Sequence, residues 1–260
     1  MSSAPLPATR FLTDAHAHLG DPGFDADRDA VLERARAAGV GAIVVVGETL
    51  ADARRNLELA ERYPMLRPCA GLYPTHLDLA QAAALHALIR SERQRLVAIG
   101  EVGLDRWVVT DEAERELQRE IFGGFVELSK ETGLPLNVHS RSAGHHVISL
   151  LLERGAERVL LHAFDGKASK ALPAVEAGYC FSVPPSVVRS EQKQKLVARL
   201  PLECLLLETD SPVLGPTREE RNEPQNVRIS LTAIAGIKGV PEQAVAEATA
   251  ENARRLFGIG

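Results

Sequence analysis

The chain has 260 residues, of which 45% are hydrophobic, 25% are charged and only 4% are aromatic. This apolar fraction excludes a wholly disordered chain, and the length suits one large α/β domain or two small ones. The formal net charge of −5 argues against a broad basic surface for duplex nucleic acid, but it does not exclude a small phosphorylated substrate.

Three features bear on where the protein works. No apolar stretch reaches the roughly 18 residues that span a bilayer, so we expect no membrane segment. The first residues, MSSAPLPATR, lack the order of a secretory signal, and we expect about residues 1–9 to be disordered. The three cysteines are too few and too scattered to predict a disulfide framework. We therefore expect a cytoplasmic protein, and nothing in the chain suggests an obligate protein partner.

Short apolar or β-branched runs alternate with segments of helical spacing along the chain. The runs that predict strands are 11–17, 42–48, 66–73, 95–102, 135–140, 158–164, 179–184 and 204–210. Between them, residues 112–132 repeat apolar side chains at intervals of three and four, which is typical of an amphipathic helix. Asp25 or Asp27 can cap an early helix, and Pro241 stands where a last helix would begin.

This repeat predicts an α/β fold of the (β/α)8 TIM-barrel type, formed by a single domain over residues 1–260. The predicted strands begin about 28 residues apart on average, which suits a strand followed by a crossover helix. Several strands are almost continuous in Val, Ile and Leu, as expected for parallel strands buried on both faces. A doubly wound open sheet is the alternative. It should carry a glycine-rich phosphate turn after the first strand, where this chain reads HAHLGDPG.

Ionisable side chains gather at the predicted carboxyl ends of five strands. They are His16 and His18 in the first strand, Glu101 in the fourth, His139 in the fifth, His162 in the sixth and Asp210 in the eighth. In a barrel these ends meet at one mouth, where so many ionisable groups are costly unless a cation pairs them. Imidazole and carboxylate ligands suit zinc, manganese, iron or nickel, whereas magnesium would rely on the carboxylates and water.

The motifs around these residues resemble the TatD family of metal-dependent hydrolases, which are amidohydrolase-like barrels. The matching pieces are TDAHAHL, GEVGLD, NVHSRSAG, LHAFDG, LETDSP and RNEP, and they span residues 12–226. HSRSAG, HAFDG, PPSVVRS and QKQKL are most similar to the branch of TatD-domain-containing protein 3. The resemblance implies a deoxyribonuclease that works from 3′ to 5′ on single-stranded DNA with a metal-activated water.

The resemblance also implies two divalent metal ions, with Zn²⁺, Mg²⁺ and Mn²⁺ as candidates. One ion would be bound by His16, His18, Glu101 and Asp210, and the other by Glu101, His139 and His162. Glu101 would bridge the two ions. Asp210 and Glu101 would be the catalytic residues, and Asp210 can orient the attacking water and accept its proton. Glu208 and Asp105 are expected to support ligand histidines by hydrogen bonding, as metal sites commonly require.

Four more side chains are candidates for substrate contact. Arg141 follows the His139 strand and Arg221 lies in the loop after the last strand, so each can fork onto a phosphate. Surface ion pairs are the alternative for both arginines. Where the TatD family often has Gly-x-His-Pro, this chain has Tyr73 before a proline, and His76 can take the place of the missing histidine. Trp107 can stack on a base, although packing is an equally good explanation.

Two other functions stay open at this point. One is hydrolysis of amides, lactones or small phosphate esters on the same barrel, which the acidic net charge favours slightly. The other is a metal-stabilised binding protein without turnover. The expected partners are therefore DNA ends or a small phosphorylated substrate.

Overall fold

Eight parallel strands form one sheet whose spatial order follows the chain from β1 to β8. The structure is a computed structural model that describes residues 11–259, so the N-terminal segment that we expect to be disordered lies outside the described residues. The strands are β1 (Leu12–Ala17), β2 (Val40–Val45), β3 (Leu66–Ala70), β4 (Ala98–Gly103), β5 (Leu136–His139), β6 (Val159–Leu161), β7 (Cys180–Val183) and β8 (Leu205–Leu207). Strand order and direction confirm the predicted (β/α)8 barrel.

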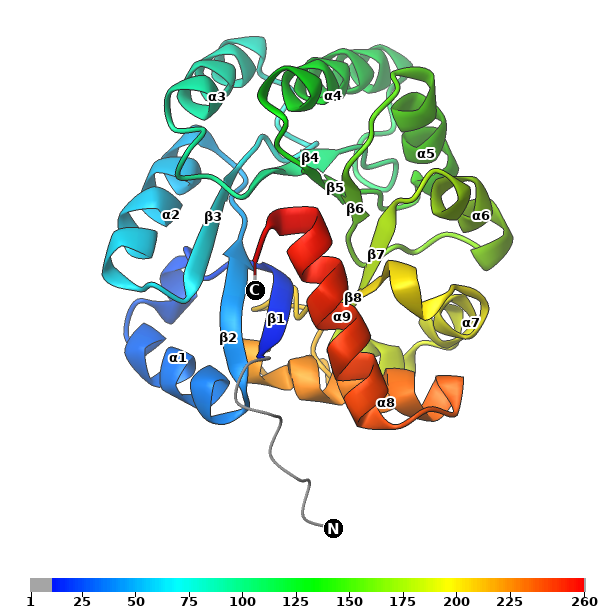
Figure 1. The fold of residues 1–260 in the computed structure, drawn as a ribbon. Helices are drawn as coiled ribbons and strands as arrows, with labels where there is room; N and C mark the ends of the chain where they lie inside the picture. The colour runs from blue at the N-terminus through cyan, green and yellow to red at the C-terminus, as the bar shows by residue number, and fades with distance from the viewer. Residues whose placement is uncertain (1–10, 260) are drawn as a thin grey trace.

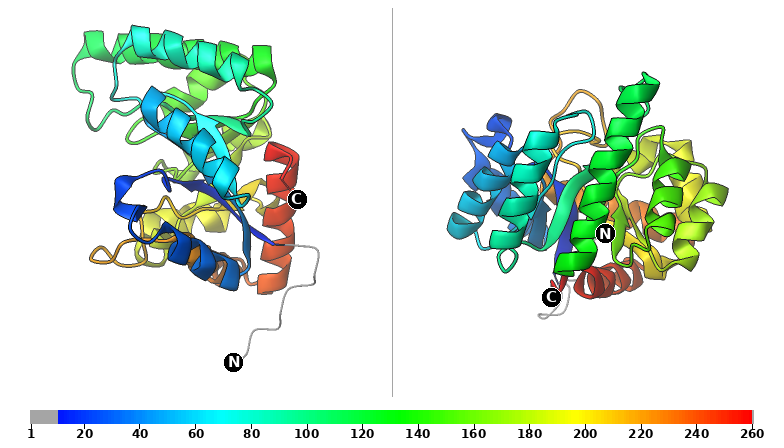
Figure 2. Two further views of the ribbon diagram at one scale, coloured as in Figure 1. Left: turned by 90° about the vertical axis from the view of Figure 1, so that its left-hand side faces the viewer. Right: turned by 90° about the horizontal axis from the view of Figure 1, so that it is seen from above.

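Helices surround the strands, and α9 alone crosses one end of the barrel (Figures 1 and 2). The α-helices are α1 (Arg28–Ala37), α2 (Leu50–Arg62), α3 (Leu79–Ser91), α4 (Glu112–Thr132), α5 (Gly144–Glu153), α6 (Ala168–Glu176), α7 (Glu191–Arg199), α8 (Val227–Lys238) and α9 (Glu242–Phe257). Short 3-10 helices are η1 (Pro22–Phe24), η2 (Pro185–Arg189), η3 (Leu202–Cys204) and η4 (Pro224–Asn226). In residues 11–259, no helix has both the length and the apolar character needed to cross a bilayer.

Small apolar side chains fill the interior of the barrel, and α9 closes one end of it. The inward-facing members of this cluster include Ala15, Val44, Cys69, Ala98, Leu160, Cys180 and Leu206. Ala253, Leu256 and Phe257 of α9 pack against them. All three cysteines are free thiols buried in the core. Because α9 blocks the amino-terminal end of the strands, only the opposite end is left for a site.

The first and last strands are joined just beyond β8. The Asp210 amide donates to the carbonyl oxygen of His16 at 2.8 Å, and the His18 amide donates to Ser211 at the same distance. The Asp14 carboxylate accepts a hydrogen bond from the Thr209 amide at 2.9 Å. These bonds hold the segment after β8 against β1 at the open end of the barrel.

Several predicted boundaries are wrong by a few residues. The strands predicted over 158–164 and 204–210 end at Leu161 and Leu207. The first strand ends at Ala17, as predicted over 11–17, but His18, which was assigned to it, lies just beyond it. His162, Asp210 and His18 therefore follow their strands and do not lie within them. The backbone leaves the extended region beyond β6 and β8, where Ala163 has a φ of 43° and Asp210 a φ of 56°. Asp210 nevertheless lines the mouth of the barrel, as Glu101 and His139 do from within their strands.

The expected caps of the first and last helices also differ in detail. Asp27 occupies the N-cap position of α1, but its side chain makes no capping hydrogen bond. Pro241 takes the same position for α9, as the sequence predicts. The predicted helix over 112–132 is α4.

Candidate metal centre

The barrel mouth opposite α9 brings together all six of the predicted metal ligands. His16, Glu101 and His139 lie in β1, β4 and β5, whereas His18, His162 and Asp210 lie one to three residues beyond β1, β6 and β8. Gly103 allows β4 to approach β5 closely here, because its φ is 149° and a Cβ would lie 2.1 Å from the His139 carbonyl oxygen.

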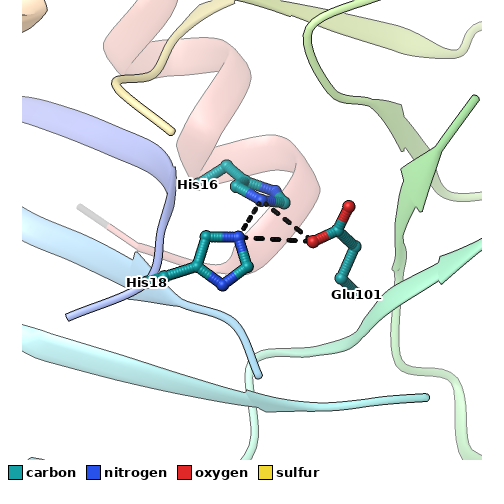
Figure 3. A group of neighbouring side chains, drawn as sticks. All are labelled: His16, His18 and Glu101. Atoms are coloured by element: carbon teal, nitrogen blue, oxygen red, sulfur yellow. Dashed lines mark hydrogen bonds and ion pairs between the residues drawn. The ribbon is translucent and has the colours of Figure 1, made fainter. Parts of the chain in front are cut away.

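One group of donor atoms surrounds the Oε2 atom of Glu101. The Nε2 atom of His16 lies 3.5 Å and that of His18 lies 3.3 Å from this oxygen. Figure 3 shows the two imidazole rings facing the Glu101 carboxylate. The two imidazole Nε2 atoms are themselves 3.3 Å apart. Asp210 completes the group, since its Oδ1 atom lies 3.5 Å from each Nε2 atom.

A second group surrounds the other oxygen of the same carboxylate. Glu101 Oε1 lies 2.7 Å from Nδ1 of His139 and 2.9 Å from Nε2 of His162. These two ring nitrogens are 3.4 Å apart. The carboxylate of Glu101 therefore stands between two sets of donors, with one oxygen directed at each set.

The spacing and chemistry of these donors fit divalent cations. Donors around a tetrahedral ion with bonds of about 2.0–2.1 Å lie roughly 3.3–3.4 Å apart, which is close to the separations in the first group and to the 3.4 Å between His139 and His162. The two contacts of Glu101 Oε1, at 2.7 and 2.9 Å, are shorter and have hydrogen-bond length. Glu101 is 1% exposed, and its Oε2 atom has no hydrogen-bond partner in the structure. A buried carboxylate oxygen without a donor is costly unless a cation is bound to it. The mouth can therefore hold metal ions through the histidine and glutamate clusters.

Without a cation, protons on the imidazoles balance the carboxylates. Burial opposes ionisation of Glu101, but His162, His139 and His16 hold the pKa of this carboxyl well below its usual range. Burial also lowers the pKa of His139, yet the carboxylates of Asp105 and Glu101 outweigh it and raise the pKa to about 9. His162 differs, because burial and the nearby His16 lower its pKa to about 4.

Side chains behind the ligands fix the orientation of two of the imidazole rings. His16 Nδ1 lies 2.9 Å from the side-chain oxygen of Asn137, and His139 Nε2 lies 3.1 Å from Asp105 Oδ2. Asp105 therefore lies within hydrogen-bonding distance of His139, as its expected supporting role requires. The hydrogen bond expected between Glu208 and His162 is not formed. The Glu208 carboxylate lies 3.8 Å from His162 Nδ1, and this nitrogen has no hydrogen-bond partner.

The sequence interpretation missed Asn137, although a signal was present. Asn137 and His139 are two residues apart on one strand, so period-two alternation places them on the same face. The amide nitrogen of Asn137 donates to the Ala15 carbonyl oxygen at 3.0 Å, which directs its oxygen at His16.

Asn137→Leu is expected to weaken metal binding by about 10–100-fold, because it removes the hydrogen bond that orients His16. The measurement is a metal titration of the apoprotein. Asn252→Leu is the matched control. Asn252 lies in α9 and is also buried, but its amide donates to the carbonyl oxygens of Leu202 and Leu205, away from the metal centre. Equal metal affinities for the two variants would show that Asn137 has no role in positioning His16.

A cavity of about 430 Å³ opens above the donor groups, within the size range of small-molecule sites. Tyr73 lines this cavity with His18, His139 and Asp210. Its ring lies edge-on to His139 with the centroids 5.0 Å apart. His76 is not among the lining residues, and its Nε2 atom lies 3.9 Å from a carboxylate oxygen of Glu48. Tyr73 thus occupies the position from which the expected substrate contact can be made.

The two arginine candidates have different surroundings. The Arg221 guanidinium donates to Asp27 at 2.5 Å and to Glu223 at 3.1 Å, and it does not line the cavity. A phosphate contact would require it to leave both carboxylates. Arg141 does not line the cavity either, but it is exposed, and no carboxylate of residues 11–259 lies within 4 Å of it, so it is free to turn toward a substrate. Its guanidinium carbon lies 5.2 Å from the ring centroid of Trp107.

The sequence did not indicate the acidic side of the cavity. Asp21, Glu48 and Asp52 line it beside β1 and β2. Asp52 accepts hydrogen bonds from the Glu48 and Thr49 amides and so belongs to the capping box of α2. This side of the cavity therefore carries negative charge apart from that of the metal-ligand groups.

Comparison with known proteins gives concordant matches. The family described as TatD related DNase matches residues 13–258. The human protein named deoxyribonuclease TATDN3 is 47% identical over 259 residues, which cover 95% of this chain and 94% of that protein. The solved structure of YJJV, a TatD homolog from Escherichia coli K12, superposes with a TM-score of 0.89 at 29% identity and covers 96% of this chain and 98% of that one. A solved uncharacterized amidohydrolase from Saccharomyces cerevisiae shares the fold, with a TM-score of 0.86 at 19% identity over 97% of this chain and all of that one.

Proposed function

The chain belongs to the TatD related DNase family, in the branch of TatD-domain-containing protein 3, and from this premise we propose that it is a divalent-metal-dependent phosphodiesterase that shortens single-stranded DNA from the 3′ end. One observation carries the proposal. The two oxygens of Glu101 face two separate donor groups at the floor of an open cavity. A carboxylate placed in this way could hold two ions close enough together to act on one phosphate.

We propose two ions. The first would be held by His16, His18, Glu101 and Asp210. The second would be held by Glu101, His139 and His162. Imidazole-rich donor groups of this kind suit Zn²⁺ or Mn²⁺, and Mg²⁺ would rely on the carboxylates and on water.

When bound, two divalent ions polarise a phosphoryl oxygen and lower the pKa of water. The protein residues then position the reactants and move a proton. Burial opposes ionisation of Asp210, but its histidine neighbours, His18 first, lower the pKa of this carboxyl. Asp210 is therefore ionised at neutral pH and lines the cavity, so it can accept the proton of the attacking water.

Tyr73 and Arg141 are proposed to contact the phosphate. Burial, together with the negative charge of Glu101 and Asp105, raises the pKa of the Tyr73 hydroxyl far above neutrality, so the phenol keeps its proton. A protonated phenol in the cavity can donate a hydrogen bond to a phosphate oxygen. Arg141 lies two residues beyond His139, and its guanidinium can bind a phosphate through two parallel hydrogen bonds.

Metal affinity is expected to rise with pH between about pH 6 and pH 9. The pKa of His139 is raised to about 9 in the apoprotein and that of His18 is also raised, so both carry protons at pH 7. Bound metal needs neutral imidazole, and binding must therefore release these protons. Calorimetry in two buffers of different ionisation enthalpy measures the number released. Affinity that stays constant from pH 6 to pH 8 would contradict this coupling.

The function is tested with an oligonucleotide labelled at its 5′ end and protein loaded with Mg²⁺ or Mn²⁺. The proposal predicts a ladder of labelled products that shortens with time, and no ladder with excess chelator. A small diester, a phosphomonoester and a lactone are assayed in parallel. If the loaded protein leaves the oligonucleotide intact and hydrolyses the phosphomonoester or the lactone, the nuclease proposal fails and the small-substrate alternative replaces it.

A further inference from the structure

We propose that the loops after β4 and β5 form a platform on which the bases next to the scissile phosphate of a single DNA strand stack, with Trp107 as its centre and Arg141 beside it. We call these two residues the base platform. The inference rests on the proposed function, because it names the part of the surface that the DNA follows from the cavity.

The first observation is the exposure of Trp107. Its side chain is 65% exposed, and the adjacent Val108 is 55% exposed. Most other apolar side chains of the described residues are buried, so a tryptophan this open is unusual. Trp107 is not one of the residues that line the cavity, but it lies two residues beyond Asp105, which contacts the lining residue His139. Every base has a π face, and stacking on an exposed aromatic ring binds single strands with little sequence preference.

The second observation is unpaired positive charge beside the indole. The Arg141 guanidinium lies over the Trp107 ring at 5.2 Å, within cation–π range. No carboxylate among residues 11–259 lies within 4 Å of Arg141. An unpaired arginine beside an aromatic ring suits a phosphate backbone with bases attached.

The third observation is the opposite charge across the cavity. Asp21, Glu48 and Asp52 line the side of the cavity near β1 and β2. A polyanion is repelled there and attracted to the side of β4 and β5. The charges therefore favour a path in which the strand leaves the cavity on the side of β4 and β5.

The fourth observation is that the platform is attached to the metal centre through Asp105. One oxygen of this carboxylate accepts hydrogen bonds from the Trp107 and Val108 amides, both at 2.8 Å. Its other oxygen lies 3.1 Å from Nε2 of His139. The Arg106 amide also donates to the Arg141 carbonyl oxygen at 3.0 Å, which joins the two loops. The backbone that carries the indole is thus held at a fixed position relative to a metal ligand, so a stacked base would limit the register of the neighbouring phosphate.

Fluorescence gives a direct test, because Trp107 is the only tryptophan of the chain. The metal-loaded Asp210→Asn protein, which is expected to turn over slowly, is titrated with a dye-labelled single-stranded hexanucleotide. The anisotropy of the dye reports binding, and Trp107 emission reports stacking. We expect quenching of Trp107 with the same midpoint as the anisotropy change, and no quenching when the oligonucleotide lacks bases. Trp107→Ala should weaken binding by about 10–100-fold, as loss of one stacked base does.

The matched control is Leu152→Ala, which removes an exposed apolar side chain near the far end of α5 and should leave hexanucleotide affinity unchanged. The ratio of kcat/KM for the hexanucleotide to that for a small diester should fall in Trp107→Ala and stay constant in Leu152→Ala. Binding without quenching, or equal affinity of Trp107→Ala and the parent protein, overturns the platform alone. Absence of any oligonucleotide binding or cleavage overturns the platform together with the proposed function.

Discussion

Glu101→Gln is expected to lower DNA hydrolysis by about a thousandfold or more and to abolish tight binding of both metal ions. The substitution preserves the shape of the side chain but replaces a ligating oxygen by an amide group, which cannot bridge two cations. Because Glu101 is the one residue that touches both donor groups, its loss affects both ions at once. Removing a single electrostatic stabiliser of a transition state typically costs 10²–10³-fold, and here two are lost. The measurements are kcat/KM on the labelled oligonucleotide and the metal content after dialysis.

Glu208→Gln is the matched control for that experiment. Glu208 is an equally buried carboxyl group near the same mouth, and burial raises its pKa to about 8, so it is mostly neutral at pH 7. Its replacement by an amide should have a far smaller effect on metal content. If Glu101→Gln retained two ions and normal turnover, the bridging role of Glu101 would be wrong.

Asp210→Asn is expected to lower kcat by about 10²–10⁴-fold while the protein keeps its fold and most of its bound metal. Asn preserves the size of the side chain but cannot accept the proton of the attacking water. The other first-group donors, His16, His18 and Glu101, remain in place, so the loss should appear mainly in kcat. Steady-state kinetics, circular dichroism and elemental analysis of the same preparation measure kcat, folding and metal content separately.

The pH dependence of the rate of Asp210→Asn supplies the internal control. In the wild type, the rate should fall at low pH as Asp210 and the ligand histidines take up protons. In Asp210→Asn, the residual rate should lose the contribution of the carboxylate and keep that of the histidines. A variant that loses all metal would instead show that Asp210 acts as a ligand alone.

The sequence predicted the barrel because the strand repeat and the buried runs of Val, Ile and Leu are local properties. It also predicted the convergence of His16, Glu101 and His139, since the carboxyl ends of parallel strands must meet at one mouth. Strand ends were less accurate. Ala163 and Asp210 adopt positive φ, which comes from tertiary contacts and not from local preference.

Other parts of the site depend on contacts that the sequence does not encode locally. The sequence is equally consistent with Arg221 as a phosphate ligand and as an ion-pair partner. Only the fold shows that Asp27 and Glu223 lie beside it. The exposure of Trp107 was equally open, because its position after a strand is compatible with packing as well as with stacking on a base. The position of this loop depends on Asp105, whose carboxylate accepts a hydrogen bond from the Trp107 amide.

The most direct test of the binuclear centre is anomalous diffraction from crystals of the full-length protein grown with Mn²⁺. The structure predicts two anomalous peaks, one on each side of the Glu101 carboxylate. The first should lie among His16, His18 and Asp210, and the second between His139 and His162. A single peak, or peaks that do not contact Glu101, would contradict the proposed two-metal site.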